Sequence, residues 1–386
     1  MGENGCHAAE CALLPVMVAM DTDVDGMLVL RALLSSSAKT LQERLSFMSS
    51  SENNPNNVLD ADDLSDTVLS PVSGDKFSCI FNLEGNISKR PPEDVLEATI
   101  TATLLLKIIR LKLASDSDDK TVEVEKKDEL NMTQLGGLIL HLILKFQCNA
   151  HCIKELQLKS DELVMLSKLA IIGYGLYCNL SLVNHSCNPN VLHSTSGKIK
   201  FLYATSIINK GEEICDSYGE RFVSHNLLER KESIEKTYYF QCDCIACIND
   251  WPLFDQLPLR FSLRCFKCSN AIDKETSKCN SCNISYNIQN KQDGNKKSKK
   301  SKQPSPHVYY DATETKKKIA SAWDKYNSVT NGINSGKYPD SEDFKVLREI
   351  NKLLAKYSVH PNKPLIQVQE FLMRYYDLQA AVAKVC

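Results

Sequence analysis

Closely spaced cysteines constrain the fold of this 386-residue chain more than any other feature. Cys242, Cys244 and Cys247 lie within six residues of one another, and a short loop of this kind cannot pair them sensibly as disulfides. Three thiols at this spacing can surround one zinc ion, which takes four thiolate or imidazole ligands in a tetrahedral arrangement. The fourth ligand must come from elsewhere, and the spacing does not choose between Cys187 and Cys215.

A second group of cysteines consists of two CxxC pairs. Cys265 and Cys268 form the first pair, and Cys279 and Cys282 form the second about ten residues later. This arrangement is typical of a zinc ribbon. Two reactive dithiols are the alternative, which the polar surroundings of these cysteines do not favour. Four further cysteines stand singly or in apolar runs and are expected to be buried thiols: Cys79, Cys148, Cys152 and Cys178.

The composition is that of a soluble intracellular protein. The chain is 43% hydrophobic and 24% charged with a formal net charge of −2, so no overall field indicates nucleic acid or an anionic membrane as partner. No apolar run approaches the roughly 20 residues of a membrane-spanning helix, and the first residues do not resemble a secretory signal. In a reducing compartment the sixteen cysteines should be thiols or metal ligands.

Periodicity predicts helices on both sides of a region of short strands. Residues 12–48 follow a helical pattern, and Pro92 followed by Glu93 and Asp94 marks the start of a mostly buried helix. Further helices are expected from Asn131 to Phe146 and over 311–329, 341–357 and 364–384.

Between the helices, an alternating pattern predicts extended backbone. Ile199, Phe201 and Tyr203 alternate with polar or smaller residues after a glycine turn, as in a strand. Two segments have little to bury: residues 115–129 are expected to form a charged loop, and the Lys-rich residues 291–306 a solvated linker. A nuclear import signal is the alternative interpretation of the Lys-rich segment.

Three segments in order carry a family resemblance. NHSCNPN at 184–190 is followed by GEEICDSYG at 211–219 and by YYFQCDCIAC at 238–247. This series resembles the core and post-SET segments of SET-domain methyltransferases, in the form found in the SMYD family, which combines SET and MYND domains. Among the subgroups of that family, the sequence resembles subgroup four most. Three other segments fit as well: IIGYGLYCNLSLVNHSC, KFQCNAHCI as an upstream helix, and His7 with Cys11 as the last ligands of a MYND finger.

The resemblance implies which cysteine completes the first zinc site. It assigns Cys187 as the ligand that joins Cys242, Cys244 and Cys247. Thiolates that share one zinc ion lie within roughly 4 Å of one another, so the metal would hold the NHSC turn against the segment that precedes Cys242. Asn184 and its neighbour His185 are then expected near Tyr238 and Phe240, with zinc as a structural staple.

The resemblance also implies a cofactor and a catalytic pair. S-adenosylmethionine is the expected methyl donor, with Tyr218 at the methyl-transfer centre and Tyr238 lining the lysine channel. Tyr239 is the alternative to Tyr238, which is preferred because it lies two residues before the aromatic that packs on adenine. The expected cofactor contacts are Asn149, Asn184, His185 and Phe240.

Two parts of the family pattern do not occur in this sequence. The Gly-x-Gly turn that precedes the MYND finger and supports the methyl donor is not found before residue 7. Of eight MYND ligands only His7 and Cys11 remain, with Cys6 as a neighbour, so these are expected to be a remnant without zinc. The sequence thus reads as a family member that lacks its N-terminus, with impaired activity as a consequence.

The predicted architecture is α+β: a SET-type short-strand β core with a helical insertion, a post-SET zinc site and a C-terminal helical domain of the tetratricopeptide-repeat type. The predicted segments are 1–11 as MYND remnant, 12–180 as helical linker and insertion region, 181–250 as SET core and post-SET segment, 251–290 as second zinc site, 291–310 as linker, and 311–386 as C-terminal helical domain.

Three functions remain open at this point. The first is a protein-lysine N-methyltransferase of nucleus and cytoplasm that acts on histone or non-histone lysines, with structural Zn²⁺ and protein partners on its C-terminal helices. The second is a non-catalytic, zinc-containing interaction protein. The third is a zinc-ribbon protein that binds nucleic acid, which the near-neutral charge does not favour.

Overall fold

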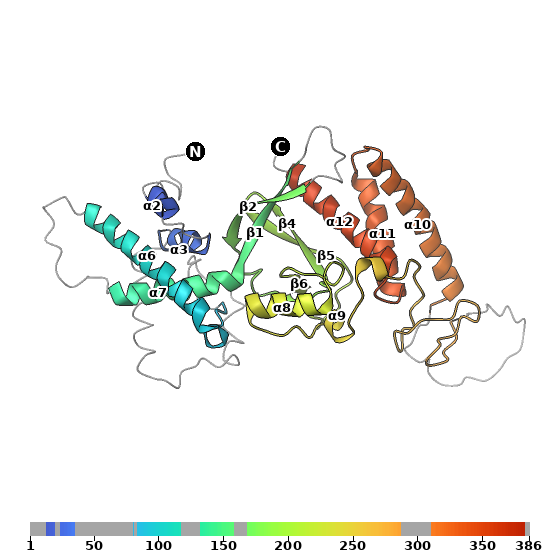
Figure 1. Ribbon diagram of the computed structural model, residues 1–386. Coiled ribbons are helices and arrows are strands. Elements are labelled where there is room, and N and C mark those ends of the chain that lie inside the picture. The colour runs from blue at the N-terminus through green and yellow to red at the C-terminus, as the bar shows by residue number, and fades with distance from the viewer. Residues whose placement is uncertain are drawn as a thin grey trace, which may run out of the picture. The chain divides into compact units, whose positions relative to one another are not determined.

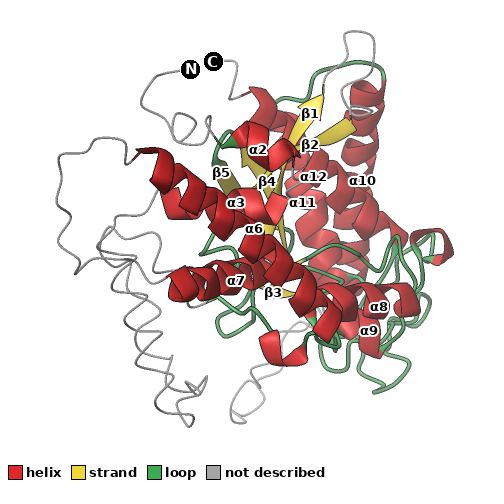
Figure 2. Cartoon of the chain, turned by 60° about the vertical axis from the view of Figure 1, so that its left-hand side comes forward, coloured by secondary structure: helices red, strands yellow, loops and turns green. Residues whose placement is uncertain are grey.

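Short strands and longer helices make up the fold of the computed structural model, as the α+β prediction requires (Figures 1 and 2). The structure describes residues 13–19, 24–34, 80, 83–116, 132–157, 168–286 and 310–382. The chain divides into two compact units. The first unit comprises residues 1–153, 173–183 and 234–241, and the second comprises 154–172, 184–233 and 242–386.

The first unit is built on packed helices. Helix α6 (Pro92–Asp116) begins at the predicted Pro92, and α7 (Met132–Asn149) packs along it. Leu138 and Leu142, four residues apart on α7, are fully buried in the core that α6 and α7 share. The other helices are α2 (Leu14–Ala19), α3 (Val24–Leu34), which packs on α6 and α7, and the short 3₁₀ turn η2 (Ile87–Lys89).

The segment KFQCNAHCI is only partly helical, so its interpretation as a helix was wrong for its second half. Helix α7 ends at Asn149, and strand β1 (Ala150–Gln157) follows at once and pairs with β2 (Lys168–Leu176). The Asn149 side-chain amide donates to the carbonyls of Lys145 and Glu84, each at 2.8 Å. It thereby satisfies a carbonyl of the last turn, so the helix can stop there.

The strands of the second unit place two turns that carry predicted site residues side by side. Strands β3 (Asn184–His185) and β6 (Cys215–Asp216) pair in parallel, with Asn184 opposite Cys215 and His185 opposite Asp216. The NHSC turn therefore lies beside DSYG. The predicted extended region is the antiparallel pair β4 (Val191–Ser196) and β5 (Ile199–Ala204), joined at Gly197 with a left-handed φ of 58°.

The predicted C-terminal helices are present with nearly the expected bounds: α10 (Ala312–Asn334), α11 (Ser341–Tyr357) and α12 (Lys363–Val382). Asp311 and Asp340 cap α10 and α11 by accepting backbone N–H bonds at the first turn. Helix α12 packs against β4, and Tyr376 stacks on Tyr203 with 3.6 Å between ring centroids. The remaining helices are α8 (Leu227–Tyr238), α9 (Ile245–Ile248) and the 3₁₀ turn η4 (Phe254–Gln256).

Several predictions fall on residues that the structure does not describe. These are the MYND remnant with His7 and Cys11, most of the charged loop at 115–129, and the Lys-rich linker. Of the expected buried thiols, Cys148, Cys152 and Cys178 are half-buried rather than buried, and Cys79 lies outside the described residues. None of the described helices combines the length and apolar character needed to cross a bilayer.

Candidate active site and metal centres

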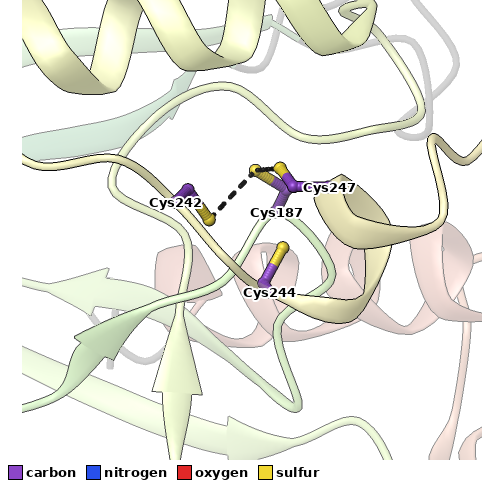
Figure 3. A group of neighbouring side chains, drawn as sticks. All are labelled: Cys187, Cys242, Cys244 and Cys247. Carbon is purple, nitrogen blue, oxygen red and sulfur yellow. Dashed lines mark hydrogen bonds between the residues drawn. The ribbon is translucent and has the colours of Figure 1, made fainter.

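Four sulfur atoms of the second unit point toward one another from two distant parts of the chain (Figure 3). Cys187 Sγ lies 3.5 Å from Cys247 Sγ and 4.0 Å from Cys242 Sγ, and all four sulfurs, including that of Cys244, lie within 4.8 Å of one another. A tetrahedral site with Zn–S bonds of about 2.3 Å has S···S separations of about 3.8 Å. The donor set and its spacing therefore fit one zinc ion.

Local backbone bonds shape this first cluster. Cys244 precedes helix α9, and its carbonyl accepts from the backbone N–H groups of Cys247 and Ile248, each at 2.9 Å. The Cys187 carbonyl accepts from Phe222 N at 3.2 Å, which fixes the other half of the site. Cys215, the alternative that spacing left open, is not part of the group; burial and the Glu213 carboxylate raise the pKa of its thiol to about 11.

Arg230 is a buried cation beside the first cluster, and the sequence analysis did not identify it. Its side chain is fully buried, and Nη2 lies 3.8 Å from Cys247 Sγ and 3.3 Å from the Ala246 carbonyl, while Nη1 donates to the His225 carbonyl at 2.7 Å. Four thiolates around Zn²⁺ carry a net charge of −2, so a guanidinium here partly offsets the charge of the loaded site. A signal existed in the sequence: Arg230 lies four residues before the buried Ile234, on the core side of α8.

The two CxxC pairs form a second cluster of the same kind. Cys265 Sγ lies 3.5 Å from Cys282 Sγ, and Cys268 Sγ lies 3.3 Å from Cys279 Sγ and 3.8 Å from Cys282 Sγ. The residue after each pair, Ser269 or Asn283, has a left-handed φ of 60° or 57° and donates its N–H back to the first cysteine of its pair. Each pair is thus a tight turn that presents two thiols to one point.

We expect the purified chain to hold two zinc ions, one in each cluster. Cys265→Ser should reduce the content to one ion per chain, because hydroxyl oxygen is a poor replacement for thiolate at a four-sulfur site. Metal analysis by mass spectrometry measures the content. Cys152→Ser, at a half-buried cysteine outside both clusters, is the matched control and should keep both ions. Retention of two ions by Cys265→Ser would contradict the second site.

His185 links the first cysteine cluster to Tyr218. Its Nδ1 accepts from the backbone N–H of Tyr218 at 3.0 Å, and its Nε2 lies 3.3 Å from Cys187 Sγ. Burial lowers the pKa of His185, which favours the neutral ring with its proton on Nε2, directed at the sulfur. Both ring nitrogens are engaged in this way, so a contact of His185 with a cofactor would have to come from its backbone.

Tyr218 lies in a setting that keeps its hydroxyl protonated. Burial raises the pKa of this phenol to about 12, and the nearby charges of Asp216 and Glu213 act in the same direction. Asp216 is itself buried, and its Oδ2 lies within hydrogen-bond distance of His193 Nδ1, at 2.8 Å. A phenol in this state can donate and accept hydrogen bonds near neutral pH without acting as a strong base.

The other predicted cofactor contact in the second unit, Asn184, lies on the exposed side of β3. Its Nδ2 donates to Glu213 Oε1 at 2.6 Å. Asn190 binds the backbone of residues 213–215: its Nδ2 donates to the Glu213 carbonyl at 2.7 Å, and its Oδ1 accepts from Cys215 N at 2.9 Å. Asn190 is therefore a positioning residue for the segment that leads into the DSYG turn, and it was not among the predicted site residues.

The remaining predicted site residues, Asn149, Tyr238 and Phe240, belong to the first unit. Tyr238 is the last residue of α8, and its carbonyl accepts from Asn86 Nδ2 at 3.3 Å. The predicted proximity of these residues to Asn184 and His185 involves both units and stays a prediction. Phe240 lies two residues before Cys242 in the sequence, so it is close along the chain to the first cysteine cluster.

Tyr239, the alternative to Tyr238, is tied into an ionic network of the first unit. Its hydroxyl donates to Asp94 Oδ2 at 2.9 Å and accepts from Arg90 Nη1 at 3.2 Å, and the Arg90 guanidinium lies 4.8 Å from its ring centroid. Burial and the bond to Asp94 raise the pKa of Tyr239 to about 12. These contacts assign Tyr239 to holding α6 against the end of α8.

The comparisons with known proteins agree with this arrangement. A family model described as SET domain matches residues 38–219, a range that contains the NHSC turn and Tyr218 and ends before the cysteine triplet. The chain therefore carries a SET domain.

Three relatives illustrate the similarity. The mouse protein-lysine N-methyltransferase SMYD4 is 28% identical over 182 residues, which cover 45% of this chain and 22% of the relative. The Arabidopsis thaliana histone-lysine N-methyltransferase ASHR1 is 30% identical over 142 residues, or 33% of this chain and 27% of the relative. Mouse histone-lysine N-methyltransferase SMYD3 is 25% identical over 177 residues, or 46% of this chain and 35% of the relative.

Over the matched segments the chain is similar to SET-domain proteins of the SMYD family. The aligned segments span only 22% to 35% of the length of these three relatives.

Proposed function

We propose that this chain is the catalytic part of an S-adenosylmethionine-dependent protein-lysine N-methyltransferase that acts on histone or non-histone proteins. The observation that carries the proposal is the connection from Cys187 through the His185 ring to the backbone of Tyr218. A structural metal site is thereby joined to the tyrosine that the SET resemblance places at the methyl-transfer centre. The names of the relatives, all lysine methyltransferases, support the same reaction.

S-adenosylmethionine would supply an electrophilic methyl group when bound, and the side chains present suit its recognition. Both N–H bonds recorded for Asn149 are donated to backbone carbonyls, so its amide oxygen is the atom suited to accept from the ammonium group of the donor. The half-buried Phe240 can pack on adenine. Asn184 contributes an amide on the exposed side of β3.

The lysine substrate must lose a proton before its amine can attack, because its unperturbed pKa is about 10.4. A poorly solvated site disfavours the ammonium form and lowers that pKa. Tyr218, protonated and held by its backbone bond to His185, can orient the neutral amine through its hydroxyl. Alignment of the amine and a fixed set of dipoles would then supply most of the rate.

The test is transfer of labelled methyl from S-adenosylmethionine to lysines of histone or other cellular proteins. We expect incorporation by the zinc-loaded chain, and a decrease of about 100-fold in Tyr218→Phe, which removes a single positioned hydroxyl. Tyr338→Phe, at an exposed tyrosine after α10, is the matched control and should leave the rate unchanged. Incorporation that Tyr218→Phe does not alter would refute the assigned role.

A further inference from the structure

A pocket of about 480 Å³ lies within the second unit, apart from Tyr218. Its lining comes from the turn around Cys187, the 205–212 loop, the segment around α9, Arg264, and the junction of α11 and α12. The volume is in the range of about 300–1,000 Å³ that is usual for ligand sites. Tyr218 and Asn184 do not line it, so it is separate from the proposed catalytic site.

The walls of this pocket are held by both cysteine clusters. Ser186 and Asn188 flank Cys187, Ile245 lies between two ligands of the same cluster, and Arg264 directly precedes Cys265. The loaded metal sites would therefore fix three of the pocket's walls. A site whose walls are fixed in advance loses less free energy to ordering when a ligand binds.

Two cations share one side of the pocket. Arg264 Nη2 donates to the Lys356 carbonyl at 3.0 Å, which keeps these residues together at the end of α11. Among the described residues no carboxylate lies within ion-pair distance of either side chain. Glu212, the acid among the lining residues, comes from the SET core and accepts from Asn209 N at 2.9 Å. Lys356 Nζ lies 5.0 Å from the Tyr357 ring centroid, so among the described residues the two cations have a carbonyl and an aromatic ring as partners but no carboxylate.

The pocket also offers apolar surface to a ligand. Ile245 and Ile207 line it and are 57% and 48% exposed, unusually high values for large apolar side chains. Trp251 adds an indole ring, which Phe222 holds edge-on at 5.1 Å between ring centroids. An indole combines a large apolar contact area with low conformational entropy, which suits it to ligand binding.

We propose that this pocket binds a carboxylate-bearing ligand with an apolar body, its carboxylate paired with Arg264 and Lys356 and its apolar part against Trp251 and Ile245. Two sources have this chemistry: an acidic-apolar peptide segment and a free amphiphilic carboxylate. The proposal does not depend on methyl transfer.

Trp251 provides a reporter inside the pocket. The chain has two tryptophans, so Trp323→Phe leaves Trp251 as the sole indole. The zinc-loaded full chain with this change is titrated with an octapeptide of alternating leucine and glutamate, and separately with 4-phenylbutyrate. The glutamine counterpart of the peptide and 4-phenylbutyramide are the neutral controls. We expect at least one carboxylate probe to change the Trp251 fluorescence, with about tenfold tighter binding than its neutral counterpart.

Two lysine variants distinguish a specific ion pair with the ligand from nonspecific electrostatic attraction. Lys356→Gln, at an exposed side chain, should weaken binding of the carboxylate probe about three- to fivefold. Lys352→Gln removes the same charge from the same helix outside the pocket and should not change binding. Binding by the peptide alone, the small carboxylate alone or both supports the proposal and identifies the source. Equal binding of acid and neutral probes, equal effects of the two lysine variants, or no fluorescence change with any probe would overturn it.

Discussion

Cys187→Ser is expected to remove one zinc ion and most of the stability of the second unit. Cys187 is fully buried and is the cluster member farthest in sequence from the other three ligands, so it alone brings the NHSC turn to the metal. Structural zinc sites bind with an apparent free energy of about 10–16 kcal/mol, which is also folding free energy. Losing the ion would therefore remove a free energy comparable to the whole stability of an ordinary domain, about 5–15 kcal/mol.

The measurements are zinc content by mass spectrometry and the thermal unfolding midpoint, with methyl transfer as a third readout. Zinc should fall from two ions to one, and methyl transfer should be lost because His185 loses its sulfur partner. Cys215→Ser is the matched control: it changes a half-buried cysteine of the same core outside the cluster and should keep both ions. If Cys187→Ser retains two ions and its unfolding midpoint, the zinc staple is wrong.

Arg230→Met is expected to destabilise the loaded protein by about 3–5 kcal/mol, the usual result of removing one partner of a buried charged pair. Methionine keeps an apolar side chain of similar length, so the loss should come mainly from the charge and its hydrogen bonds. Lys231→Met, at the next position of α8 and only half-buried, is the matched control and should change the free energy of unfolding by less than about 0.5 kcal/mol.

Competition with a chelator distinguishes charge compensation from packing at Arg230. If the guanidinium offsets the charge of the loaded cluster, Arg230→Met should weaken zinc binding at the first cluster, whereas Lys231→Met should not. Zinc affinity that Arg230→Met leaves unchanged would assign Arg230 to packing alone.

Local sequence patterns determined most elements of the fold. Pro92 at the start of α6 and the bounds of α11 follow from neighbouring residues, because helix ends depend on caps and on periodicity within a few turns. The prediction was wrong at KFQCNAHCI, which was interpreted as a helix with the family resemblance: α7 ends at Asn149, and the backbone changes to β1. That change depends on the carbonyl of Glu84, 65 residues away, to which Asn149 donates.

For the cysteine clusters, too, ligands that are close in sequence were predictable from local patterns, whereas the distant ligand was not. The sequence by itself determined the CDCIAC triplet and the two CxxC pairs, because ligands a few residues apart are brought together by the local turn whatever the rest of the chain does. It could not choose between Cys187 and Cys215 from spacing. Only the tertiary structure placed Cys187 at the other thiols and left Cys215 out, because an approach across 55 residues depends on how distant segments of the chain pack.

The same holds for the side chains around the cluster. The sequence indicated Tyr218 and His185 through a family resemblance, but not that the ring of His185 is engaged between Cys187 and Tyr218. Nor did it identify Arg230: its spacing from Ile234 places it on the core side of α8, but spacing alone does not show that the guanidinium is fully buried. Burial and hydrogen-bond partners are properties of the packed chain, so only the tertiary structure could decide them.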